Sequence, residues 1–104
     1  MSTVRKLNES ALRGIYDAYM HEAFPPAELK PLAVMLRLME RGRYLCYGYY
    51  RNGRLAAYAF FYRHDSRVLL LDYFAVTPEL RGRGVGSAFL AALDAVLGGV
   101  CILG

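Results

Sequence analysis

The stretch that decides the fold is FAVTPELRGRGVGSAFLAAL, which runs from Phe74 to Leu93. It places three glycines and two arginines within six residues, Arg81 to Gly86, directly before a segment of helical periodicity. Glycine loses more backbone entropy on folding than any other residue, so a helix that begins in glycines is costly. We interpret the three glycines in two ways: the backbone is bare for a ligand, or the chain makes a tight turn that packs closely on a strand.

The segments around the glycines predict a strand, a loop, a helix and a second strand. Val68–Val76 is an apolar run typical of a strand, and residues 84–97 repeat apolar side chains at helical period. The glycine pair 98–99 ends that helix, and Val100–Leu103 begins another strand, which such a crossover places parallel to the first. That last strand has no partner on its far side. We therefore expect residues 1–104 to form a single, truncated domain, or a second copy to pair there in a homodimer.

Upstream, the sequence predicts an antiparallel meander. Tyr44–Arg51 and Arg54–Arg63 are aromatic-rich strands, and Asn52-Gly53 between them is the strongest short signal for a hairpin. Together with residues 68–76 they make three antiparallel strands. The predicted fold class is therefore α/β, with a mixed sheet built from this meander and the strand-loop-helix-strand unit.

Two helices are predicted before the meander. Asn8 is a typical N-cap, and apolar side chains then repeat at helical spacing from residue 9 to about residue 22. Prolines interrupt the pattern in FPPAELKP, and a second helix runs from Pro31 to a stop at Gly42.

Composition limits the classes of function. The 104 residues fit one small domain, and the formal net charge is +4. Eleven of the 13 basic residues are arginine, whose planar guanidinium suits phosphate, but they are spread along the chain, which disfavours nucleic-acid binding. No run reaches the roughly 20 apolar residues of a membrane span, and no signal peptide is evident. Cys46 and Cys101 have no metal or redox spacing, so we expect free thiols, no metal site and a cytoplasmic protein.

The glycine loop fits one of three phosphate-binding patterns. A dinucleotide fingerprint requires a glycine where Ser87 stands, and a nucleotide P-loop requires a lysine after Gly86. The remaining pattern is R-x-x-G-x-G, read from Arg81 to Gly86 between a strand and a helix. The first turn of a helix has unpaired N–H groups and a positive dipole end, and residues without a Cβ let a pyrophosphate approach them.

The segment FAVTPELRGRGVGSAFL resembles motif A of the GNAT superfamily of N-acetyltransferases, and the order of elements over nearly the whole chain is similar to that family. The resemblance implies an α/β GNAT fold whose C-terminal helix and last strands are absent here. It implies that backbone N–H groups hold the pyrophosphate of acetyl-CoA, with Arg81 and Arg83 adding charge at the rim. These groups would belong to Gly82, Arg83, Gly84, Val85, Gly86 and Ser87. Phe74, Ala75 and Val76 would pair with the pantetheine arm, beside a bulge that separates the two parallel strands.

Acetyl transfer by this family proceeds by direct attack of an amine on the thioester, which needs a base. Asp72 is the candidate, since it is the one charge in VLLLDYFAV and lies four residues before Val76, on the same strand face. The alternative is that Asp72 makes a structural hydrogen bond. His21 and His64 are weaker candidates. The family's usual thiolate donor is a tyrosine on a later helix, which the printed sequence does not reach.

The acceptor is expected to bind near the loop between the first two helices, where Phe24, Pro25 and Glu28 could line a cleft, and some sheet tyrosines could join them. It could be a peptide N-terminus, a lysine, a polyamine or an aminoglycoside. The resemblance thus implies an N-acetyltransferase that uses acetyl-CoA and an amine acceptor. The alternatives are a non-catalytic CoA-binding or acyl-CoA-binding module and, less favoured, a nucleic-acid-binding protein.

Overall fold

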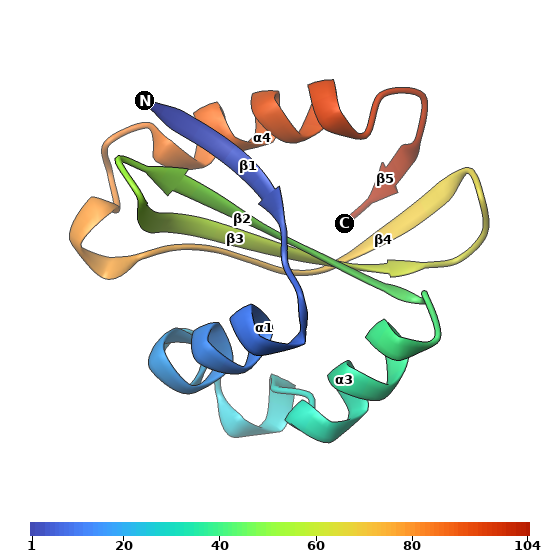
Figure 1. Cartoon of the computed structure of the whole chain (residues 1–104). Helices are drawn as coiled ribbons and strands as arrows, with labels where there is room; N and C mark the ends of the chain where they lie inside the picture. Colours follow the sequence, from blue (N-terminus) through green and yellow to red (C-terminus); the bar gives the residue numbers. More distant parts are fainter.

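A computed structural model describes all 104 residues and shows a five-stranded sheet between two layers of helix (Figure 1). The strands lie in sequence order: β1 (Ser2–Lys6), β2 (Tyr44–Arg51), β3 (Arg54–Arg63), β4 (Val68–Val76) and β5 (Cys101–Leu103). The helices are α1 (Glu9–Ile15), α2 (His21–Ala23), α3 (Leu32–Glu40) and α4 (Val85–Val96). No helix is both long enough and apolar enough to cross a membrane. No three His, Cys, Asp or Glu side chains lie together as a metal site.

The sheet confirms the predicted mixed α/β architecture with one correction. Strands β1 to β4 are antiparallel neighbours, and β5 runs parallel to β4 after the crossover through α4. Asn52 and Gly53 both have positive φ, as a two-residue hairpin turn requires. The meander has four strands, not three, because β1 was not predicted. Four of its five residues are exposed, so an edge position leaves it without the apolar alternation that marks a half-buried strand.

The first helix begins and continues as expected. The Asn8 side chain accepts a hydrogen bond from the Ala11 amide at 2.9 Å, which caps α1. A π-helical turn, Tyr16–Met20, then joins α1 to α2, so the helical segment runs from residue 9 to residue 23. The π turn was not expected from the periodicity, and such turns are frequent at functional sites.

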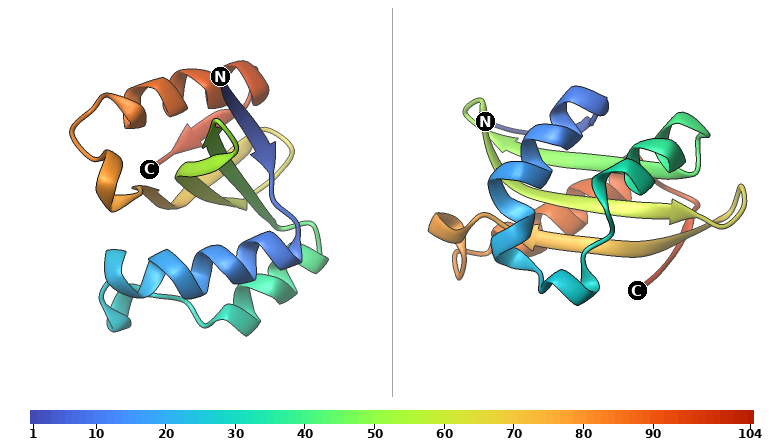
Figure 2. Two further views of the ribbon diagram at one scale, coloured as in Figure 1. Left: turned by 60° about the vertical axis from the view of Figure 1, so that its left-hand side comes forward. Right: turned by 90° about the horizontal axis from the view of Figure 1, so that it is seen from below.

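Apolar clusters lie on both faces of the sheet, and Figure 2 shows the helices that cover each face. The face covered by α1 and α3 carries Tyr44, Cys46, Tyr58, Phe60 and Tyr73 from the strands. The opposite face packs on α4, which buries Val85, Phe89 and Leu93. Val96, the last residue of α4, is 54% exposed and lies outside this core, although it belongs to the apolar repeat of residues 84–97.

Candidate functional site

The loop before α4 is shaped by two glycines in the left-handed region. Gly82 and Gly84 both have a φ of +77°, a conformation that costs residues with a Cβ roughly 1–2 kcal/mol. No atom lies within 4 Å of the place where a Cβ would stand at either position. The backbone here is therefore bare toward open space and not toward a neighbouring element. This geometry fits the interpretation that the backbone at these two glycines is bare for a ligand.

The third glycine of the motif has a different environment. A Cβ on Gly86 would lie 3.6 Å from a methyl of Val76 and 3.7 Å from the ring of Phe74. These are ordinary contact distances between α4 and β4. Residue 86 therefore faces β4, but a Cβ would fit there, so the packing of the helix on the strand does not by itself require a glycine at this position.

The amides of this loop form a set of unused donors. No side chain caps α4, and no acceptor in the chain receives a backbone N–H from residues 82 to 87. The first turn of any helix leaves its N–H groups unpaired, and the loop residues before α4 extend this set to six consecutive donors that an anion could accept. The positive end of the α4 dipole adds to the attraction for negative charge. The loop therefore fits the two phosphates that the sequence motif predicts.

The two arginines of the loop have different roles in the structure. Arg81 donates from Nε to the carbonyl of Val76 at 3.3 Å and forms an ion pair with Glu22 at 3.4 Å. It thus connects the loop to the end of β4 and to α2. Arg83 is exposed and has no partner, so its charge is available to an anion.

A bulge in β4 determines where Asp72 points. In the ladder with β3, Tyr73 pairs with Phe60 and Leu71 pairs with Phe61, so Asp72 is the extra residue. The expectation that Asp72 and Val76 share a face is wrong. Val76 packs on the α4 side, whereas Asp72 contacts Tyr44 on the side of α1 and α3. Regular alternation along the strand predicts that Asp72 and Val76 lie on the same face. The inserted residue shifts the alternation, so the two side chains lie on opposite faces.

Asp72 lies at the centre of a polar cluster of three side chains. Its Oδ2 accepts a hydrogen bond from the Tyr44 hydroxyl at 2.5 Å and an ion-paired hydrogen bond from Lys30 Nζ at 2.8 Å. Burial, and then the hydrogen bond to the Asp72 carboxylate and its charge, raise the pKa of Tyr44 well above its usual value. Burial and the same carboxylate raise the pKa of the Cys46 thiol. Tyr44 therefore stays protonated and remains a donor to Asp72.

The ladder between the parallel strands ends close to this bulge. β5 pairs with Val68, Leu69 and Leu70 of β4 and with no later residue. Among residues 1–104, no strand lies beside the edge of β4 from the bulge to Val76.

Comparison with known proteins identifies the family. Residues 10–100 match the model of the acetyltransferase (GNAT) family. The chain belongs to this family. A comparison with curated proteins gave no match.

Solved GNAT structures share the fold. The ribosomal-protein-S18-alanine N-acetyltransferase from Escherichia coli is 26% identical, with a TM-score of 0.69 over 93% of this chain and 59% of its own. A GNAT-family protein from Bacteroides thetaiotaomicron is 19% identical, with a TM-score of 0.78 over 92% of this chain and 56% of its own. AAC(6')-Iy, solved with the bisubstrate analogue CoA-S-monomethyl-acetylneamine, is 21% identical, with a TM-score of 0.62 over 100% of this chain and 78% of its own. The chain thus spans less than two thirds of the first two structures.

Three residues around Asp72 were not predicted from sequence. Lys30, Tyr44 and Tyr73 lie in a loop and at two strand positions, and each contacts its partners across 28 to 45 residues of chain. No spacing rule connects such distant positions. The only signal was the placement of Tyr73 directly beside Asp72 in the sequence.

The other candidate residues lie in four separate places. Phe24 packs edge-on against Tyr73, with ring centroids 4.9 Å apart, and Glu28 points its side chain into solvent. His21 is exposed and packs against Tyr16, and His64 lies in the turn after β3. Neither histidine contacts Asp72.

Tyr58 is a further buried group near the GNAT loop. It lies opposite Ala75 in the ladder, and its hydroxyl is buried without a hydrogen-bond partner. Burial raises the pKa of Tyr58 to about 12; the Arg81 guanidinium opposes this rise and the Glu22 carboxylate adds to it.

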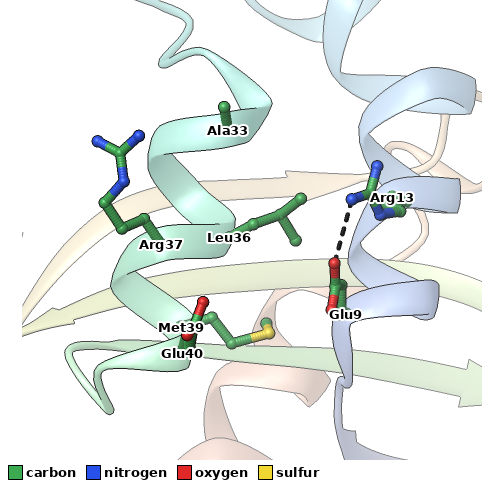
Figure 3. Close-up of a pocket in the computed structure, with 7 residues that line it drawn as sticks. All are labelled: Glu9, Arg13, Ala33, Leu36, Arg37, Met39 and Glu40. Carbon is green, nitrogen blue, oxygen red and sulfur yellow. Dashed lines mark hydrogen bonds and ion pairs between the residues drawn. The ribbon is translucent and has the colours of Figure 1, made fainter.

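The largest surface hollow lies away from the glycine loop. It has a volume of about 450 Å³ between α1 and α3 and includes the ion pair of Glu9 and Arg13 (Figure 3). Leu36 and Met39 line it together with charged side chains of α3. Figure 1 shows that α3 and the loop before α4 lie at opposite ends of the sheet. A smaller hollow, about 260 Å³, adjoins the loop at Glu79 and Leu80.

Proposed function

We propose that this chain binds acetyl-CoA and transfers its acetyl group to a primary amine. The observation that carries the proposal is the set of six free amides from Gly82 to Ser87, opened by two glycines of positive φ. Two phosphates present enough acceptor oxygens to take several of these donors at once. The unpartnered charge of Arg83 adds to the attraction.

The free edge of β4 supports the placement of the pantetheine arm. Its two amide groups can pair with the backbone of Phe74, Ala75 and Val76 in the way that an added strand does. Within residues 1–104 the ladder to β5 covers only Val68, Leu69 and Leu70, and the later backbone groups of β4 have no partner on that side. An arm that starts at the pyrophosphate and runs back along β4 leads its thioester toward the bulge at Asp72.

Asp72 is proposed as the base. The amine nitrogen attacks the thioester carbonyl, the C–S bond breaks, an amide forms and CoA leaves as its thiol. Asp72 accepts the proton that the ammonium must lose before it can attack. The bulge supports this role, since it points the carboxylate toward the side where the loop between α2 and α3 lies.

The relatives support an amine acceptor without naming one for this chain. The E. coli protein is named for an alanine of a ribosomal protein, and the AAC(6')-Iy analogue joins CoA to an acetylated neamine. An acceptor in this chain would reach Asp72 past Phe24 and the loop that follows it. Two unpaired thiols, Cys46 and Cys101, support the cytoplasm as its compartment.

One observation favours the alternative of a binding module. Asp72 already accepts hydrogen bonds from Lys30 and Tyr44, as a carboxylate with a purely structural role does. Two measurements separate these functions. We expect acetyl-CoA to raise the melting temperature, since it binds only the folded form, and CoA to form when amines are added. A rise without CoA formation over peptide, polyamine and aminoglycoside amines would establish the module. No rise at all would contradict both.

A further inference from the structure

The side chain beside the proposed base is itself an amine. Lys30 Nζ lies 2.8 Å from Asp72 Oδ2, and its side chain remains 36% exposed. Lys30 comes from the loop between α2 and α3, whereas Asp72 comes from the bulge of β4, so the contact joins two separate parts of the chain. Lys6 is the only other lysine, and no ion pair involves it.

The backbone of Lys30 is held in place on both sides. Its N–H donates to the Tyr73 hydroxyl at 2.8 Å, and its carbonyl accepts from the Tyr16 hydroxyl at 2.8 Å. The Tyr73 hydroxyl in turn donates to the carbonyl of Glu28 at 2.7 Å. These bonds attach the loop to β4 and to the π-helical turn. The amine is therefore positioned at Asp72 by the fold and is not a freely moving surface lysine.

We propose that Lys30 is a site of self-acetylation, at which the chain transfers an acetyl group from acetyl-CoA to its own ε-amine. This inference rests on the proposed function, because it needs the thioester at the bulge. An arm that begins at residues 82–87 and follows Phe74–Val76 would lead toward Asp72, and Lys30 Nζ is the amine that contacts this carboxylate. An amine held beside both a base and a thioester reacts as if its concentration were very high.

The protons and bonds of the transfer are all accounted for by Lys30, Asp72 and acetyl-CoA. The Lys30 ammonium gives a proton to Asp72, and the neutral nitrogen attacks the thioester carbonyl. The C–S bond breaks, an N-acetyl amide forms on Lys30, and CoA takes up the remaining proton as its thiol. The product carries no charge on Lys30, so the ion pair with Asp72 is lost. Tyr44 remains as the donor to the carboxylate, and an incoming acceptor amine can take the place of the ammonium.

The test uses the two lysines as an internal comparison. The chain is incubated with acetyl-CoA, and acetylation of Lys30 and Lys6 is followed separately by peptide mass spectrometry. Lys30 should be acetylated about tenfold faster than Lys6 or more, because only Lys30 is held at a base. Lys30→Arg keeps the positive charge and should abolish the fast phase, whereas Lys6→Arg should keep it. Asp72→Asn and Gly84→Glu should slow Lys30 to the rate of Lys6.

A melting titration with acetyl-CoA on the same samples separates the two ways of failing. If acetyl-CoA raises the melting temperature but Lys30 reacts no faster than Lys6, the self-acetylation proposal is wrong and the binding proposal stands. If acetyl-CoA leaves the melting temperature unchanged, both are wrong. A fast phase that persists in Gly84→Glu would also overturn the inference, since the acetyl group would then arrive without the loop.

Discussion

The glycine loop and the bulge of β4 represent two different ways of building a site. The loop is a run of consecutive residues, Arg81 to Ser87, and it offers backbone N–H groups. The bulge site brings together Lys30, Tyr44 and Asp72, and it offers side chains from a loop and two strands. The first site depends on local backbone angles, whereas the second depends on the tertiary fold. Substitutions in the loop should therefore act on ligand binding, and those at the bulge on proton transfer and stability.

Replacement of Asp72 by asparagine should give the largest effect. The amide keeps the shape of the carboxylate but cannot take a proton from the acceptor. We expect CoA formation with an amine to slow by about 10²- to 10⁴-fold, the usual contribution of a general base. The melting shift produced by acetyl-CoA should be unchanged, since Asp72 lies outside the loop. Equal loss of binding and of transfer would contradict the division between the two regions.

Gly84→Glu should act on the binding of acetyl-CoA, whereas Asp72→Asn acts on the transfer step. It forces a side chain into the left-handed region and puts a negative charge where the phosphates would lie. The melting shift with acetyl-CoA should disappear. Gly14→Glu is the matched control, because it adds the same charge at an exposed helical glycine with no atom within 4 Å of its Cβ position. If the control loses the shift as well, net charge and not the loop governs binding.

Two tyrosine substitutions compare a paired hydroxyl with an unpaired one. Tyr44→Phe removes the donor to Asp72, and hydrogen bonds to charged groups contribute about 1.5–3 kcal/mol. Urea denaturation should show a loss of that order in the free energy of unfolding. Tyr58→Phe removes a buried hydroxyl without a partner, so the free energy of unfolding should be unchanged or higher. Equal losses would mean that the Tyr44 hydrogen bond adds nothing beyond burial.

The smallest effects should appear within the loop itself. Gly84→Ala should lower the free energy of unfolding by roughly 1–2 kcal/mol, since alanine disfavours a φ of +77°. Gly86→Ala should raise it by up to about 1 kcal/mol, because residue 86 is helical and a methyl meets only ordinary contacts. Urea denaturation of the pair checks the sign. A loss in both would show that residue 86 is as restricted as residue 84.

The backbone geometry of the glycine loop follows from the sequence for a physical reason, and its ligand stays a prediction. The positive φ angles and the free N–H groups all belong to neighbouring residues, Arg81 to Ser87. The strands β2, β3 and β4 were predicted with their observed ends for a similar reason, because apolar runs and the Asn52-Gly53 turn are local signals.

The bulge site could be predicted only in part. Asp72 stands out as a charge within an apolar strand, but its direction depends on one inserted residue that alternation does not reveal. Lys30 and Tyr44 reach it from 42 and 28 residues away, and no spacing rule covers such distances. β1 was missed because its edge position needs no apolar pattern. Local backbone geometry can therefore be predicted from the sequence, whereas the side-chain contacts depend on how the strands pair in the sheet.

The most direct test of the loop as the pyrophosphate site is a titration of the ¹⁵N-labelled chain with CoA, followed by the amide signals in NMR spectra. The amides of residues 82–87 should show the largest shifts, since they are the free donors that the phosphates would take. The amides around the hollow between α1 and α3 should stay in place. Shifts centred on that hollow, or no shifts in residues 82–87 at saturating CoA, would contradict the assignment.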